Sequence, residues 1–229
     1  MPGRSCRGGE VMLLAGEVML LAIDTCGTIG TIALARREGE SVIALIQIEL
    51  AGKTFAAQLV PRIRELLQEQ SATLQNLEAI IVVNGPGSFT GVRIGVSAAK
   101  GLAEALQIPV IALSRLVLLA QKGETQAAAL DAGRREVYFG RYANGKALES
   151  LAALEDLRET AEPIAVCEEN LAQDWPAARL IAPPTAAEAI AAALPRLLIQ
   201  DYDDIAALDG NYVRRTDAEL FARPAGGRK

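Results

Sequence analysis

The run from Val82 to Gly95 constrains the fold most, because it places a glycine-rich turn between an apolar segment and a helix-like one. Its sequence is VVNGPGSFTGVRIG, preceded by the apolar residues 79–83 and followed by a helix-like stretch over residues 92–106. Glycine and proline at this density mark a sharp turn with exposed backbone. The run therefore predicts a strand, a tight loop and a helix in immediate succession.

This loop also presents groups that bind anions. Ser88 and Thr90 are suitable N-cap residues, and the free N–H groups of a helix start attract phosphate or carboxylate. Arg93 is unusual because a cation in the first turn opposes the helix dipole, so we expect it to have an acidic or anionic partner. Together with Gly85 and Gly87, these residues form a candidate anion or nucleotide site. The alternative is a capped strand-to-helix turn whose glycines serve close packing.

The same run continues into Ala98-Ala99-Lys100-Gly101-Leu102-Ala103, and the whole resembles the signature of the TsaB (YeaZ-like) family. The resemblance extends from about Met19 to Ala132, with weaker similarity up to Arg214. Proteins of this family are accessory subunits of the bacterial machinery that forms N6-threonylcarbamoyladenosine in tRNAs reading ANN codons. The resemblance implies an α/β actin/hexokinase/Hsp70-like (ASKHA) fold of two lobes, each with a mixed β-sheet and helices.

Composition limits the chemistry that the chain can perform. The net charge is −5 and aromatic residues are 4% of the chain, so nothing indicates independent nucleic-acid binding, and we expect tRNA contact mainly through partners. Histidine is absent, which excludes Ser-His, Cys-His and histidine-based metal chemistry and argues against a metallopeptidase. The cysteines, Cys6, Cys26 and Cys167, are widely spaced and indicate a reducing, cytoplasmic environment rather than a disulfide framework or a zinc site.

The amino end contains a short repeat, in which EVMLLA at residues 10–15 recurs at residues 17–22. The apolar stretch is interrupted by Glu17 and is shorter than the roughly 20 residues of a membrane span, so we expect no membrane association. We predict that residues 1–18 are a dispensable extension, residues 19–114 an N-terminal lobe, residues 115–215 a C-terminal lobe, and residues 216–229 a flexible tail.

Alternating and helical hydrophobic patterns predict the order of the elements. In the first lobe we expect strands at residues 19–24, 30–36, 41–50, 79–83 and 110–113, with helices at 54–69 and 91–106. In the second lobe we expect a hairpin of residues 126–131 and 136–142, and an Asn144-Gly145 turn into residues 146–149. Further strands are expected at 164–167 and 179–181, and a helix at 186–199.

Two other segments could approach a nucleotide. Asp24-Thr25-Cys26-Gly27-Thr28 follows the first strand, where an acidic residue and backbone N–H groups can face phosphates and a metal-bound water. A plain hairpin turn capped by Asp24 is an equal alternative. Asp131-Ala132-Gly133 resembles a second phosphate loop of actin-like ATPases, with a charged hairpin turn as its alternative.

The family resemblance also assigns a protein interface. The helices at 54–69 and 91–106 form the surface that family members share with a second copy of themselves or with the TsaD-type paralogue. The small residues of the second helix allow close approach of another helix, although inside a domain they usually serve internal packing. The predicted interface residues are Leu59, Ile63, Leu66, Gly91, Gly95, Ala98, Ala99 and Leu102.

The resemblance thus predicts a non-catalytic subunit that binds a TsaD-type transferase, helps to recruit a TsaE-type ATPase and forms a homodimer when alone. It requires no cofactor of its own, although ATP and magnesium could lie at the interface of the complex. The alternative is a self-sufficient ASKHA-fold ATPase or small-molecule kinase that uses Asp24, Asp131 and the loop 85–91 with magnesium. Hydrolysis that Asp24→Ala abolishes would distinguish the two.

Overall fold

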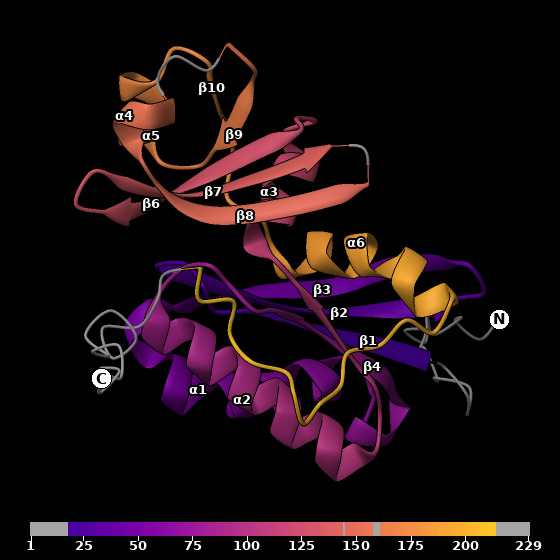
Figure 1. Cartoon of the computed structure of the whole chain (residues 1–229). Coiled ribbons are helices and arrows are strands. Elements are labelled where there is room, and N and C mark those ends of the chain that lie inside the picture. The colour runs from indigo at the N-terminus through magenta and orange to yellow at the C-terminus, as the bar shows by residue number, and fades with distance from the viewer. Residues whose placement is uncertain (1–17, 144, 158–160, 214–229) are drawn as a thin grey trace, which may run out of the picture.

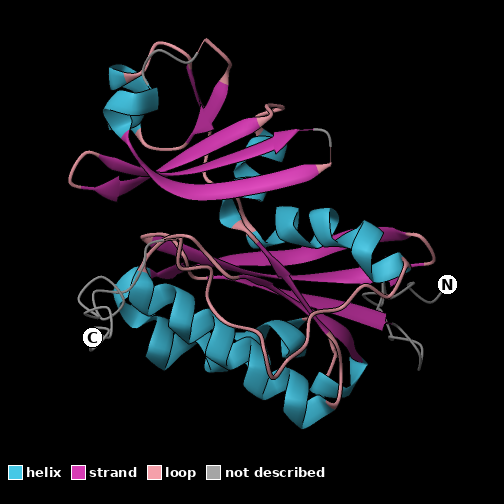
Figure 2. Ribbon diagram, viewed as in Figure 1, coloured by secondary structure: helices cyan, strands magenta, loops and turns pink. Residues whose placement is uncertain are grey.

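The computed structural model describes residues 18–143, 145–157 and 161–213, which form two lobes, each built on one β-sheet (Figure 1). The predicted extension, apart from Val18, and the predicted tail lie outside these residues, as do Asn144 and Arg214. Both sheets are mixed, and helices accompany each of them, as Figure 2 shows. The two-lobed α/β architecture expected from the sequence is therefore confirmed.

The first sheet has the strand order β3-β2-β1-β4-β5. Its first three strands form an antiparallel meander, and β4 and β5 run parallel to β1 because helices connect them. These strands agree closely with the predicted ones; they are β1 (Val18–Asp24), β2 (Ile29–Glu38), β3 (Ser41–Ala51), β4 (Leu77–Val83) and β5 (Val110–Leu113).

Two long helices cover one face of this sheet, α1 (Phe55–Glu69) and α2 (Phe89–Leu106). A short turn, η1 (Gly52–Thr54), precedes α1, and η2 (Leu74–Asn76) precedes β4. Helix α2 begins at Phe89 rather than at Gly91, because the Ser88 hydroxyl accepts the Gly91 N–H at 3.3 Å and caps the helix. The prediction of Ser88 as an N-cap is confirmed, whereas Thr90 lies inside the first turn.

The second sheet has the order β10-β9-β6-β7-β8. The predicted hairpin of the second lobe is present. The strand that follows it, predicted at residues 146–149, continues to Ala153. The strands are β6 (Ala127–Gly133), β7 (Glu136–Ala143), β8 (Lys146–Ala153), β9 (Ile164–Val166) and β10 (Ala178–Leu180). Helix α3 (Arg115–Lys122) packs on one face of this sheet, and Trp175 with α4 (Leu154–Leu157) and α5 (Glu169–Asp174) packs on the other. None of these three helices was among the predicted elements.

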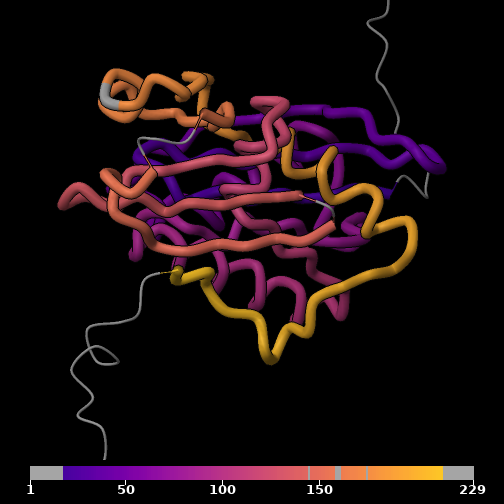
Figure 3. The backbone as a smooth tube through the Cα atoms, turned by 45° about the horizontal axis from the view of Figure 1, so that its top comes forward, coloured from indigo at the N-terminus to yellow at the C-terminus, as the bar shows by residue number. Residues whose placement is uncertain are grey.

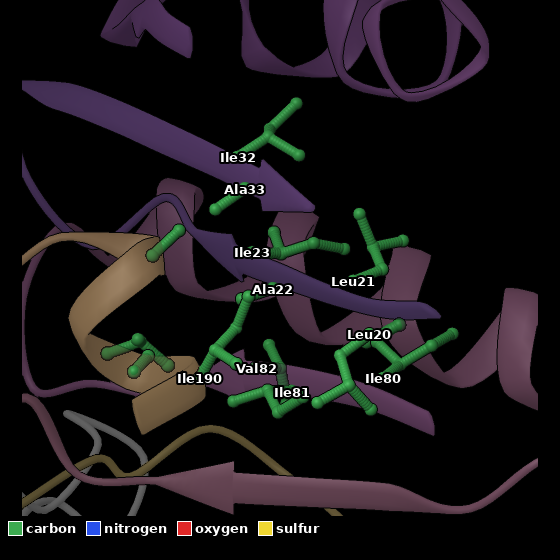
Figure 4. Close-up of a cluster of buried hydrophobic side chains, with 14 of the residues drawn as sticks. Leu20, Leu21, Ala22, Ile23, Ile32, Ala33, Ile80, Ile81, Val82 and Ile190 are labelled. Carbon is green, nitrogen blue, oxygen red and sulfur yellow. The ribbon is translucent and has the colours of Figure 1, made fainter. Parts of the chain in front are cut away.

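Helix α6 (Ala186–Leu198) corrects the predicted lobe boundary, because it belongs to the first lobe rather than to a C-terminal lobe of residues 115–215. It lies on the face of the first sheet opposite α1 and α2, where its apolar residues join the core of strands β1, β2 and β4 (Figures 1 and 4). Thr31 on β2 accepts the Ala186 N–H at 2.8 Å and fixes the start of the helix. The chain therefore crosses into the second lobe and returns.

The core of the first lobe explains why its strands are almost continuously apolar. Strand β1 is central and has helices on both faces, so Met19 to Ile23 are each at most 1% exposed. Figure 4 shows Leu20, Ile23, Ile80 and Ile190 within this layer. Burial on both faces requires apolar residues at successive positions instead of alternation.

Candidate functional site

The candidate anion loop packs directly against the turn that follows β1. The Thr25 hydroxyl donates to the Gly91 carbonyl at 2.7 Å, and the Ser88 N–H donates to the Cys26 carbonyl at 2.8 Å. Asp24 is 3% exposed, and its Oδ1 accepts the Cys26 N–H at 2.8 Å. The turn and the loop, predicted separately, therefore meet, and several of their polar groups are already used within the chain.

The glycines of this loop are required by close approach to that turn. A β-carbon on Gly87 would lie 2.4 Å from the Cys26 carbonyl oxygen, and one on Gly91 would lie 2.0 Å from the Thr25 carbonyl oxygen. A β-carbon on Gly95 would lie 2.4 Å from the Thr25 hydroxyl. Gly85 has a φ of 111°, a conformation that favours glycine. The packing alternative thus accounts for Gly87, Gly91 and Gly95, and backbone conformation accounts for Gly85.

Among the described side chains, the partners of Arg93 are aromatic rather than acidic. Its guanidinium lies 3.7 Å from the centre of the Phe89 ring, and its Nε donates to the Tyr212 hydroxyl at 3.3 Å. The Phe89 and Tyr212 rings are themselves 5.3 Å apart. A cation over aromatic faces is stabilised by their quadrupoles, which offsets its unfavourable position at the helix start.

Asp131 lies at the end of β6 in the second lobe, on an exposed turn. Its Oδ1 accepts the Gly133 N–H at 2.7 Å, and its Oδ2 accepts the Asn170 amide at 2.9 Å. Gly133, Arg134 and Arg135 have φ values of 74°, 56° and 63°, so the hairpin turn is left-handed throughout. These contacts are those of the hairpin-turn alternative.

A buried charge cluster between the lobes was not predicted. Arg115 is 8% exposed, and its guanidinium interacts with the carboxylates of Asp24 in the first lobe and Glu168 in the second. Burial raises the pKa of both carboxyls, and the guanidinium opposes that rise. Within the described residues, the Nε of Arg115 and the Oε2 of Glu168 are buried without a hydrogen-bond partner. One sequence signal existed: Arg115 is the only charge in the apolar run from residue 108 to residue 120.

The two described cysteines are not activated thiols. Burial, reinforced by the Asp24 carboxylate, raises the pKa of Cys26 well above its ordinary value. Burial, with the nearby Glu168, raises the pKa of Cys167 to about 12. Both therefore remain protonated at neutral pH and are poor nucleophiles.

The predicted interface residues are mostly internal, which corrects their assignment as a surface. Leu59, Ile63 and Leu66 on α1 are at most 2% exposed, and Ala99 on α2 is fully buried. Gly91 and Gly95 face the β1–β2 turn, while Ala98 and Leu102 are half-buried. The side chains that a partner could contact on these helices are different ones, among them Val60, which is 50% exposed.

The described residues show neither a metal-binding cluster nor a membrane-spanning helix. They contain no cluster of three cysteine or acidic side chains arranged to hold a metal ion. Among their helices, none has the length and hydrophobicity needed to cross a membrane.

The chain is similar in sequence to a known protein family and to several of its members. Residues 44–207 match the family described as "TsaD: tRNA N6-adenosine threonylcarbamoyltransferase". The chain is 37% identical over 136 residues to the tRNA threonylcarbamoyladenosine biosynthesis protein TsaB of Haemophilus influenzae, covering 57% of this chain and 56% of that one. It is 39% identical over 127 residues to the TsaB of Bacillus subtilis, covering 54% of each. The matched region thus spans about half the length of these relatives.

A solved structure matches over a longer range. YeaZ from Pseudomonas aeruginosa is 30% identical, with a TM-score of 0.68, and the match covers 85% of this chain and 99% of that one. The match spans both lobes, which agrees with the ASKHA-like fold expected from the sequence. The chain belongs to the TsaB/YeaZ family, within the group related to the TsaD transferases.

Proposed function

We propose that this chain is a non-catalytic partner subunit in the formation of N6-threonylcarbamoyladenosine in tRNA. In this proposal it binds a TsaD-type transferase, assists recruitment of a TsaE-type ATPase, and pairs with itself when alone. The observation that carries the proposal is the packing of the β1–β2 turn against the glycine loop, which uses within the chain several of the groups that a nucleotide would need. Membership of the TsaB/YeaZ family supports a role for the chain in this tRNA modification pathway.

The chemistry of the described side chains supports a role without catalysis. Both described thiols are held protonated, and Asp24 is buried beside the guanidinium of Arg115. The net charge of −5 favours tRNA contact through other subunits. We expect no cofactor to be required by this subunit alone, and any ATP and magnesium to act at the interface of the complex.

The outer side of α1 and α2 is the proposed partner surface. Between these helices and the turn before β4 lies a hollow of about 280 Å³, with apolar walls from Val60, Leu67, Leu74 and Leu102. Val60 is half exposed at its rim. An exposed apolar hollow beside mixed charges is typical of a protein-binding site. In this proposal the surface binds a TsaD-type partner or, when that partner is absent, a second copy of the chain.

Reconstitution tests the proposal. We expect tRNA modification by the TsaC-, TsaD- and TsaE-type proteins of the same source to require this chain, while the chain alone stays inert. Modification that proceeds equally without it would contradict the proposal. ATP hydrolysis by the chain alone, abolished by Asp24→Ala, would favour the ATPase alternative.

A charge placed on the proposed surface is expected to weaken pairing. Val60→Glu should reduce affinity for a TsaD-type partner, or for a second copy, at least about tenfold, because a carboxylate would be desolvated in an apolar contact. Leu180→Glu is the matched control, since Leu180 is 49% exposed on β10 of the other lobe. Affinity is measured by calorimetry or sedimentation. Equal effects of the two variants would place the interface elsewhere.

A further inference from the structure

The segment from Asp203 to Val213 follows α6 and connects features that the proposed function leaves unexplained. It contains no helix or strand, and its single bridge joins Asp203 to Val110. Figures 1 and 3 show this yellow segment crossing the first lobe alongside α2. We call residues 203–213 the strap.

The strap is fixed to the first lobe at several points. Asp203 accepts the Ala112 N–H at 2.7 Å, and Lys100 on α2 donates to the Leu208 carbonyl at 2.8 Å. The Asn211 N–H donates to the Asn84 carbonyl at 2.6 Å, beside the glycine loop. The Leu208 side chain joins the core of the first lobe. The strap is thus an integral part of that lobe.

Two neighbouring strap residues point to different lobes. Tyr212 contacts Phe89 and Arg93 on the first turns of α2, where Phe89 is 48% exposed. The Asn211 amide donates to Glu149 Oε2 at 2.5 Å, and Glu149 belongs to β8 of the second lobe. The Tyr142 hydroxyl on β7 donates to the other oxygen of Glu149 at 2.6 Å. The start of α2 and the β7–β8 hairpin are therefore joined through adjacent residues.

We propose that the strap couples the exposed surface at the start of α2 to the β7–β8 hairpin of the second lobe. A protein that covers Phe89 restrains Tyr212, and through the backbone it restrains Asn211 and its bond to Glu149. Binding at the start of α2 therefore stabilises the β7–β8 hairpin by a certain factor. By linkage, loss of the Asn211–Glu149 contact weakens binding at α2 by the same factor. The partner part of this inference rests on the proposed function.

Hydrogen exchange without any partner tests the coupling itself. In Asn211→Ala and in Glu149→Ala, we expect the β7–β8 amides that pair across the hairpin to exchange about tenfold faster than in the wild type. Tyr212→Ala should accelerate the same amides, although Tyr212 contacts α2 rather than the hairpin. Tyr202→Ala is the control, since Tyr202 is exposed and precedes the strap. Unchanged exchange in Tyr212→Ala, with accelerated exchange in Asn211→Ala, would overturn the coupling.

A second arm adds the TsaD-type protein. Binding should slow exchange in the β7–β8 hairpin of the wild type at least about threefold, and this protection should be lost in Asn211→Ala while binding persists more weakly. Binding without protection of the hairpin would overturn the coupling to a partner. If the TsaD-type protein does not bind at all, the proposed function fails, whereas the first arm still decides whether the strap joins the lobes.

Discussion

Gly91→Ala is expected to lower the free energy of unfolding by about 3 kcal/mol, the upper part of the range for overpacking in a close-packed interior. The added β-carbon would lie 2.0 Å from the Thr25 carbonyl oxygen, which is backbone and cannot rotate away. Either α2 or the β1–β2 turn must move, and the Thr25–Gly91 hydrogen bond of 2.7 Å would be strained. Chemical denaturation monitored by circular dichroism gives the value.

Gly101→Ala is the matched control in the same helix. No atom lies within 4 Å of its β-carbon position, so alanine meets no obstacle and removes the helix cost of glycine. We expect stability to rise by about 1 kcal/mol. Opposite signs for one substitution at two positions of α2 would establish that Gly91 serves packing. A Gly91→Ala variant as stable as the wild type would instead return the loop to the anion-site interpretation.

The sequence predicted the first lobe well because its signals are local. Strands such as β1 and β4 are apolar at nearly every position, and the glycine loop marks where β4 ends and α2 begins. Helix α6 was also predicted, but its lobe was not. An amphipathic pattern indicates that one side of a helix is buried, without indicating which sheet buries it.

The same limit explains the errors in the predicted interface. The family resemblance assigned the helices at residues 54–69 and 91–106 to a partner surface, although the side chains of Leu59 and Ile63 are buried in the core of the first lobe. Periodicity cannot distinguish a core-facing stripe from a partner-facing one. Val60, adjacent to Leu59 in sequence, is exposed because a helix turns about 100° per residue.

The interlobe cluster depends on contacts between residues far apart in the chain. Asp24 was identified from its turn, but Arg115 and Glu168 meet it only because both lobes converge there. Tyr212 likewise provides the partner of Arg93 across more than a hundred residues. Contacts between residues so far apart in the chain depend on how the strands and helices are arranged in space. A single sequence does not show that arrangement.

Arg115→Met is expected to have the second large effect, a loss of about 3 kcal/mol of stability at pH 8, because it leaves the buried Asp24 carboxylate without its neighbouring positive charge. Methionine keeps much of the volume, so the loss measures the cost of leaving two carboxylates, the buried Asp24 and the half-buried Glu168, without a neighbouring cation. Arg62→Met is the control: Arg62 pairs with Glu65 at 2.6 Å on the surface, and its loss should cost less than about 1 kcal/mol.

The pH dependence of this loss identifies its cause. Burial raises the pKa of Asp24 above its ordinary 3.8 and that of Glu168 above 4.5, so the native state holds protons that the unfolded state has released. The contribution of these two carboxyl groups to folding stability is full when the pH is below their ordinary pKa values. It is lost as the pH rises through their raised pKa values. Without the guanidinium both pKa values rise further, so the deficit of Arg115→Met should shrink between pH 8 and pH 5. A deficit independent of pH would mean that Arg115 acts through packing, and that its charge does not hold the two lobes together.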